Sequence, residues 1–346
     1  MVKPVNPRET AKFIAKRAKN VKVTDKGVKK VAADLYSSLF RGAYTLSLWR
    51  EHNLNPGISN EFAINWIFLV NSINFSYWPD PDQEFAVTYK QAEYTGYWAI
   101  CAIINRALNQ GIPMVSPEYY SNLSYDQVQR IFRAHKKGKP NEPMELPLLK
   151  ERANIMKDNG KILVKKFSSN FVTVVVKAKK SARSLLQLIY ENFPSFRDEC
   201  VFNKERVGFY RRAQLLISDI YACHEGKNLG KFDDIDYLTL LVDQRAPQYL
   251  HFCNVLSYSL ELRKKLKLGE VLKYDDPDVI EMRGVAIHAY ELIKREVKRM
   301  QVRCGVKLPL PLTPTIMEFY FWDLERNRRD EIDRQLPSHK IRAIHY

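Results

Sequence analysis

The sequence has few cysteines, few glycines and no long apolar run, and each shortage excludes a class of protein. Its 346 residues include five scattered cysteines with no C-x-x-C pair, which excludes a disulfide-built scaffold and the common zinc modules and indicates a reducing compartment. With 13 glycines and 17 prolines, the chain is not of low complexity. The longest apolar stretch, residues 62–75, is interrupted by asparagines and is too short to span a bilayer.

The familiar catalytic signatures are also missing. The sequence contains no G-x-x-x-x-G-K-[ST], G-x-G-x-x-G, H-E-x-x-H or G-x-S-x-G motif. The seven histidines are scattered, so no ligand spacing supports a metal site, and we expect no cofactor. The first residues are basic but lack the apolar segment of a secretory signal. We therefore expect a cytoplasmic protein, with the nucleus and the mitochondrion as alternative compartments, and no association with membranes.

Positive charge is what the sequence has in excess. It contains 55 lysines and arginines against 39 aspartates and glutamates, a net charge of +16. Such a charge favours an anionic partner, either a nucleotide or a nucleic acid. The glycine-containing hairpin motif with which many proteins hold duplex phosphates is missing, which argues against duplex binding.

Apolar residues recur mostly at helical spacing. This pattern predicts helices within residues 62–73, 98–108, 148–167, 209–220, 236–245, 247–266, 280–303 and 315–333. Residues 171–177 are β-branched and form either a strand or a helix, whereas residues 136–147 read as a loop or linker. The predicted fold is all-α. Residues 1–346 form a single catalytic domain in this interpretation, or two lobes, 1–135 and 148–346, joined by 136–147.

Two carboxylates lie in apolar surroundings and are candidates for catalysis. Asp243 follows an apolar run and precedes Pro247, which is favoured at the start of a helix; it either caps that helix or acts as a partly desolvated catalytic group. Glu318 is flanked by apolar residues, so it is either buried with a raised pKa, as an acid needs, or on the wet side of its helix. Asp323, on the same stretch, is expected to form a salt bridge.

Aromatic rings and paired arginines are candidates for substrate binding. Phe75, Tyr77 and Trp78 follow an apolar helix, where they either stack a planar base or pack in the core. Arg211 and Arg212 either bind a phosphate through forked hydrogen bonds or face the solvent.

Five stretches of sequence resemble a known family when they are taken together. They are NFSYW (74–78), YTGYWAICAIINRALNQGIP (94–113), FYRRAQ (209–214), LTLLVDQRAPQ (238–248) and FYFWD (319–323). In this order they resemble the queuosine salvage proteins, the queuosine 5′-phosphate N-glycosylase/hydrolases, over about residues 31–346. The resemblance implies a helical, DNA-glycosylase-like fold with the active site in a cleft between helical lobes.

The resemblance also implies an activity and roles for single residues. The activity is hydrolysis of the N-glycosidic bond of queuosine 5′-monophosphate, which gives queuine and ribose 5-phosphate. The catalytic aspartate of the family's FADYRxPQ motif falls on Asp243, and the tyrosine of that motif is replaced by Gln244. A queuine-binding aspartate of the family is Glu318 here, and His52 matches a histidine that contacts the base.

The resulting hypothesis is a metal-independent nucleotide hydrolase without a stable nucleic-acid partner, active as a monomer. Two alternatives from other classes stay open: a DNA- or RNA-base glycosylase and a non-catalytic, tRNA-binding helical module. The residues expected to bind the substrate are His52, Phe75, Tyr77, Trp78, Arg211, Arg212, Arg245, Gln248, Glu318 and Asp323.

Overall fold

Helices form most of the structure, but short strands lie between them. The computed structural model describes residues 3–78, 84–305 and 307–346. The helices of the first half are α1 (Pro7–Ala15), α2 (Asp25–Phe40), α3 (Leu48–Glu51), α4 (Glu61–Ser72), α5 (Gly96–Asn109), α6 (Pro117–Tyr120), α7 (Tyr125–Ile131) and α8 (Leu149–Lys166). Those of the second half are α9 (Val172–Lys177), α10 (Ala182–Asn192), α11 (Arg211–Cys223), α12 (Arg245–Phe252), α13 (Leu260–Leu268), α14 (Pro277–Cys304), α15 (Pro314–Asn327) and α16 (Arg329–Gln335). Short 3-10 helices cover Pro194–Phe196, Asn228–Gly230 and Ile235–Tyr237.

The strands pair into several small sheets. They are β1 (Val21–Val23), β2 (Phe85–Tyr89), β3 (Ala92–Tyr94), β4 (Ala134–Lys136), β5 (Lys139–Met144), β6 (Glu199–Phe202), β7 (Glu205–Gly208), β8 (Leu256–Tyr258), β9 (Val271–Leu272) and β10 (Lys340–Ile341). Four of them form an antiparallel sheet in the order β3-β2-β4-β5. Strands β1 and β8, and β6 and β7, pair antiparallel, whereas β9 and β10 pair in parallel.

The prediction of an all-α, DNA-glycosylase-like fold is therefore wrong, because the protein is mixed α and β. Strand β5 shows why the sequence misled us. Its residues, KPNEPM, are polar and almost all exposed, so they lack the alternation of apolar and polar residues that indicates a strand. The sequence pattern therefore predicts a loop for these residues, as part of 136–147, and this prediction is wrong. Gly138, with φ near +71°, allows the turn that returns β5 onto β4.

Most predicted helices are confirmed, and residues 171–177 settle as helix α9, with Val172, Val174 and Val175 buried. Three predictions near the site are wrong. Residues 238–243 form neither a helix nor a strand, and the backbone N–H of Val242 donates to the carbonyl of Leu240 instead of continuing a helix. The helix predicted for 247–266 is divided by β8, and the one predicted for 315–333 is divided at Arg328 into α15 and α16.

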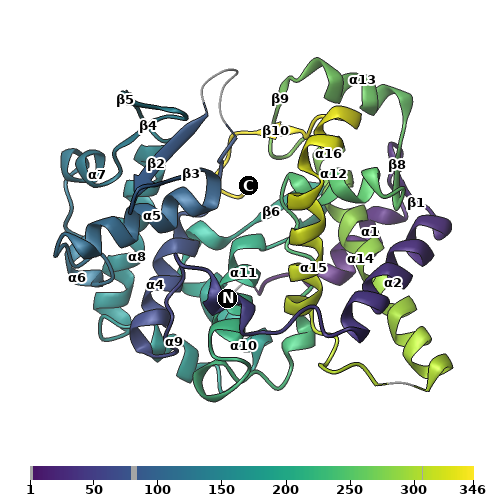
Figure 1. Cartoon of the computed structure of the whole chain (residues 1–346), viewed down its shortest axis with the longest axis horizontal. Helices are drawn as coiled ribbons and strands as arrows, with labels where there is room; N and C mark the ends of the chain where they lie inside the picture. Colours follow the sequence, from purple (N-terminus) through teal and green to yellow (C-terminus); the bar gives the residue numbers. More distant parts are fainter. Residues whose placement is uncertain (1–2, 79–83, 306) are drawn as a thin grey trace.

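The apolar side chains gather in two cores. One surrounds α4, α5 and α8 to α10, and the other surrounds α1, α2, α12 and α14 to α16. Figure 1 shows α4, α5, α8 and α9 on the left and the second group on the right, with α10, α11 and α15 near the middle. Helix α11 packs against both α4 and α15; its buried apolar side chains belong to the first core, so it brings that core against α15. Among the described residues, no helix is long and apolar enough to cross a bilayer.

Candidate active site

Two adjoining cavities lie where the two cores meet. The Asp243 cavity, of about 440 Å³, is lined by residues of α5, α12, α15 and the segments around Trp78 and Ser338. The His52 cavity, of about 300 Å³, is lined by residues of α3, α5, α11 and α15. Arg211 and Glu318 line both cavities, as do Tyr97 and Trp322. The two cavities thus share a wall of one cation, one carboxylate and two rings.

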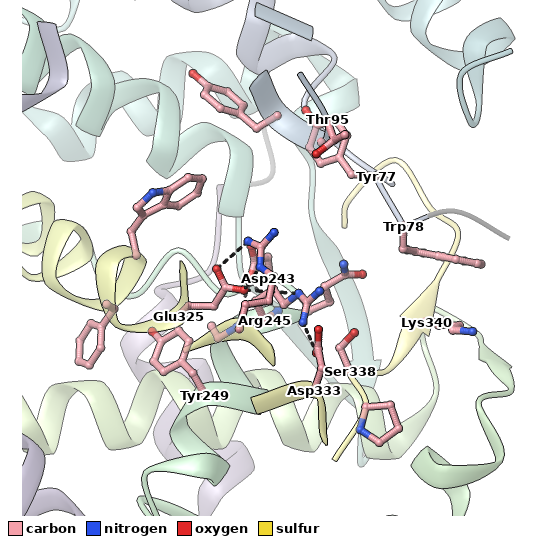
Figure 2. A pocket seen from close by; sticks show the side chains of 18 of the residues that line it. Tyr77, Trp78, Thr95, Asp243, Arg245, Tyr249, Glu325, Asp333, Ser338 and Lys340 are labelled. Carbon is pink, nitrogen blue, oxygen red and sulfur yellow. Dashed lines mark hydrogen bonds and ion pairs between the residues drawn. The ribbon is translucent and has the colours of Figure 1, made fainter. Parts of the chain in front are cut away.

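Asp243 stands at the start of helix α12 and faces the first cavity. The buried, irregular segment before it, residues 238–242, places it at the N-terminus of the helix. Its Oδ1 accepts hydrogen bonds from the backbone N–H groups of Arg245 (2.8 Å) and Ala246 (3.0 Å). Its Oδ2 lies 3.6 Å from Nη2 of Arg211, and its side chain is 32% exposed. Asp243 therefore caps the helix through Oδ1, and this leaves Oδ2 available to a ligand, so capping and catalysis do not exclude each other here (Figure 2).

Glu318, on α15, is enclosed and incompletely hydrogen-bonded. Its Oε2 has no hydrogen-bond partner among the described residues. Burial, and then the negative charge of Asp243, raise the pKa of Glu318 to about 8, whereas Arg211 and a backbone hydrogen bond with Leu241 act in the opposite direction. Glu318 is therefore mostly protonated at pH 7 without a ligand; its side chain is half-buried, although Oε2 itself is inaccessible to solvent.

Arg211 and Arg212 are neighbours in sequence but have different surroundings. The Arg211 side chain is 12% exposed and lies between the two cavities, where its Nη1 donates to the carbonyl of Asn74 (3.3 Å). Arg212 is 2% exposed and lines neither cavity. It donates to the carbonyls of Asn71, Ser72 and Ser195, so its guanidinium group serves the core.

Arg245 lines the Asp243 cavity but is held in a network of ion pairs. Its Nη1 donates to Asp333 Oδ1 (2.5 Å) and to Gln248 Oε1 (3.0 Å), and its Nε lies 3.7 Å from Glu325. Glu325 in turn accepts two hydrogen bonds from Arg329. The network connects α12, α15 and α16 (Figure 2). Gln248 itself is buried and outside the lining of the cavities.

The predicted aromatic residues separate into cavity and core. Tyr77 and Trp78 line the Asp243 cavity, and they are fixed there because Tyr77 donates to Asn74 and Trp78 donates to the carbonyl of Ile341. Phe75 is fully buried, with the guanidinium carbon of Arg152 at 4.3 Å from the centre of its ring. The structure therefore places Phe75 under the site rather than in it.

His52 lies in the second cavity with its ring stacked on Trp98, the ring centres 3.4 Å apart. Burial, and then the charge of Arg326, lower the pKa of His52 to about 4, so the ring is neutral at pH 7. Asp323 lines the same cavity and accepts a hydrogen bond from Tyr44. The cavity thus offers flat rings together with hydrogen-bonding groups.

Sequence reasoning missed Asp219 and Tyr249, which also line the cavities. Asp219 accepts hydrogen bonds from Trp49 Nε1 (2.9 Å) and Asn71 Nδ2 (2.8 Å), and burial raises its pKa to about 7. A signal was available, because Asp219 stands eight residues after Arg211 on one helix and so shares its face. Among the described residues, no group of three or more histidines, cysteines or carboxylates could hold a metal ion.

Comparisons with known proteins agree with the resemblance drawn from the motifs. A family model described as "Queuosine salvage protein" matches residues 54–346. Relatives named queuosine 5′-phosphate N-glycosylase/hydrolase occur in Mus musculus (40% identical), Bos taurus (38%) and Schizosaccharomyces pombe (33%). Each alignment covers 98% or 99% of this chain and 99% of the relative. The chain therefore belongs to the queuosine salvage protein family.

Proposed function

We propose that this protein is an N-glycosyl hydrolase that cleaves queuosine 5′-phosphate into queuine and ribose 5-phosphate. The observation that supports this most strongly is Asp243, a carboxylate fixed by two backbone N–H groups beside a cavity that adjoins a second, aromatic one. The names of the relatives, which align over nearly their whole length, agree with it.

The reaction needs a negative charge near the sugar. When the bond between C1′ and the base nitrogen breaks, its electron pair leaves with the base and the ribose becomes an oxocarbenium-like cation. Asp243 Oδ2 stabilises that cation, either by its charge while water attacks C1′ or by a covalent bond to C1′ that water later hydrolyses. In both cases the oxygen of the water ends on C1′, and one of its protons replaces the sugar on the base nitrogen. Queuine is a 7-deazapurine, which has a carbon atom in place of N7. Protonation at that position therefore cannot activate the base as a leaving group. Catalysis therefore depends on the carboxylate and on tight binding of the base.

The His52 cavity suits that base. His52 and Trp98 present flat surfaces to a planar ring, while Glu318 and Asp323 accept hydrogen bonds from donors on its edge. The side arm of queuine carries an amine, and a carboxylate such as Glu318 pairs with it once that carboxylate is ionised. In this arrangement Glu318 binds the base and Asp243 acts on the sugar.

The 5′-phosphate requires cations within the Asp243 cavity. Arg211 and Arg245 line the Asp243 cavity and fit this role, whereas the carbonyl-bound Arg212 does not. The net charge of +16 raises the local concentration of an anionic nucleotide. We propose a monomer that acts on the free nucleotide in the cytoplasm; five unpaired cysteines agree with a reducing compartment.

A comparison of substrates tests the proposal. Queuosine 5′-phosphate, the 3′-phosphate, free queuosine and a labelled duplex are incubated with the protein, and released base and sugar are measured by mass spectrometry. We expect queuine and ribose 5-phosphate from the 5′-phosphate. Its kcat/KM should be at least tenfold above the values for the 3′-phosphate and for free queuosine, because binding of the 5′-phosphate positions the sugar. Equal kcat/KM for all of them, or release of a base from the duplex, would contradict the proposal.

A further inference from the structure

Unpaired polar atoms gather at the Asp243 cavity. Buried side-chain nitrogen and oxygen atoms normally have hydrogen-bond partners, so each exception needs an explanation. Among the described residues, the exceptions include Arg211 Nε, Tyr249 Oη and Glu318 Oε2, and all three residues line this cavity. Arg211 and Glu318 already have roles in the proposed function, whereas Tyr249 has none.

Tyr249 is fixed by packing, and its hydroxyl group has no hydrogen-bond partner among the described residues. Its side chain is 4% exposed, and its ring stacks on Phe321 with the centres 5.3 Å apart. It lies on the same face of α12 as Arg245 and Ala246, whose N–H groups hold Asp243. Figure 2 shows its ring rising from α12 toward α15. A buried donor without an acceptor lowers stability, so its presence beside the reacting carboxylate indicates a ligand.

The charges around Tyr249 indicate which kind of hydrogen-bonding group the ligand presents to it. Burial, and then the charges of Glu318 and Asp243, hold the pKa of Tyr249 well above its usual value, so the phenol is a hydrogen-bond donor. A ligand group that meets the phenolic hydrogen must accept a hydrogen bond. A hydroxyl group of the ligand can accept from the phenol and donate to either neighbouring carboxylate at the same time.

We propose that Tyr249 binds the ribose of the nucleotide by donating its phenolic hydrogen to the 2′-oxygen. This inference rests on the proposed function, because it assumes that Asp243 faces C1′. The carbon next to C1′ carries the 2′-hydroxyl group, so that group lies beside Asp243 and within the part of the cavity that Tyr249 lines. In glycoside hydrolysis, hydrogen bonds to the corresponding hydroxyl group strengthen in the transition state. Tyr249 therefore selects ribonucleotides over deoxyribonucleotides and contributes to turnover.

The test combines one variant with two substrates. Tyr249→Phe removes only the hydroxyl group and keeps the ring on Phe321. We expect kcat/KM for queuosine 5′-phosphate to fall about tenfold to a hundredfold, and kcat/KM for 2′-deoxyqueuosine 5′-phosphate to change less than threefold. The greater intrinsic lability of the deoxynucleotide cancels, because each substrate is compared between two proteins.

A matched control removes another buried phenol close by. Tyr290 is fully buried, packs on the same Phe321 and donates to the carbonyl of Pro314, but it lines neither cavity. Tyr290→Phe is expected to change kcat/KM for the two substrates by the same factor. Binding of queuine, which lacks the ribose, should have the same Kd in Tyr249→Phe as in the original protein, and the melting temperature should not fall.

The outcomes separate this inference from the proposed function. An equal loss with both substrates in Tyr249→Phe, or a weaker Kd for queuine, would overturn the role of Tyr249 while leaving the hydrolase activity established. Failure of the unaltered protein to release queuine from queuosine 5′-phosphate would instead overturn the proposed function. A loss confined to the ribonucleotide supports both.

Discussion

At the scale of single residues, the site is defined by carboxylates in contrasting environments. Asp243 is partly exposed and held by two backbone N–H groups and Arg211, whereas Glu318 is enclosed and lacks a partner at Oε2. Two carboxylates in such different surroundings can take different roles in one reaction. In our account Asp243 is ionised and faces the ribose, whereas Glu318 is protonated without a ligand and ionises when the base binds.

The pKa of about 8 for Glu318 predicts proton release on binding. An ammonium group on the ligand favours the ionised carboxylate, so binding of queuine at pH 7 releases close to one proton, and affinity rises as the pH increases from 6 to 8. In Glu318→Gln we expect affinity to fall about tenfold to a hundredfold, the value of a charge-assisted hydrogen bond. Glu318→Asp, which introduces the residue that the resemblance implies at this position, should bind better than Gln. Calorimetry in two buffers of different ionisation enthalpy measures the proton count.

Asp219, with its pKa of about 7 in the same cavity, is the other group that could release the proton. Proton release that persists in Glu318→Gln would assign the release to Asp219. Queuine binding to Glu318→Gln as tight as to the original protein would contradict the role of Glu318.

Without a ligand, pH acts on the folding stability in the opposite direction from its effect on affinity. The folded protein keeps the Glu318 proton up to a pKa of about 8, whereas the unfolded chain loses it near pH 4.5. Stability therefore decreases as the pH rises from that value toward 8.

Neighbouring residues show how far the sequence could identify the site. Arg211 and Arg212 were equal candidates, yet one lines the cavities and the other is tied to core carbonyls. Adjacent residues on a helix point about 100° apart, so only the orientation of α11 decides between them. Tyr249 escaped notice for a related reason, since a buried aromatic residue on an amphipathic helix has the same pattern whether it faces core or cavity.

At the scale of elements, long helices with one apolar face were predictable and short strands were not. Helix α8 buries one face along its length, including Leu149, Ile155, Met156 and Leu163, and such a face gives a strong periodic signal. Strands β9 and β10 are two residues long, too short for any alternation to be recognised. The irregular segment before Asp243 is apolar except for Thr239, and a buried run of this kind cannot be distinguished from a helix by periodicity.

The packing of α1 on α14 supplies a prediction at this scale. A Cβ atom on Gly284, in the middle of α14, would lie 2.5 to 2.7 Å from side-chain atoms of Ile14. We expect Gly284→Ala to destabilise the protein by about 1–3 kcal/mol through this overlap, although alanine favours helices by about 1 kcal/mol. Urea unfolding measures the change. Adding Ile14→Ala should recover part of the loss from the overlap in a double-mutant cycle, and a Gly284→Ala protein of unchanged or greater stability would contradict the close packing.

At the scale of the whole molecule, the site is assembled from most of the chain. His52 comes from the segment after α3, Arg211 from α11, Asp243 from the start of α12 and Glu318 from α15. These segments belong to both apolar cores, so neither core alone contains the site. The sequence could indicate the family because its motifs are long and ordered. It could not show the mixed fold, since the pairing of short strands depends on contacts far apart in the chain.

The most direct test of the account compares the protein with its Asp243→Asn variant on queuosine 5′-phosphate. The asparagine oxygen can still accept from the N–H groups of Arg245 and Ala246, so the cap is kept and only the charge is lost. We predict that release of queuine falls at least about a hundredfold, the scale of removing a strong electrostatic group, while the melting temperature stays the same. Release of queuine at the original rate by a normally folded Asp243→Asn protein would contradict the central claim.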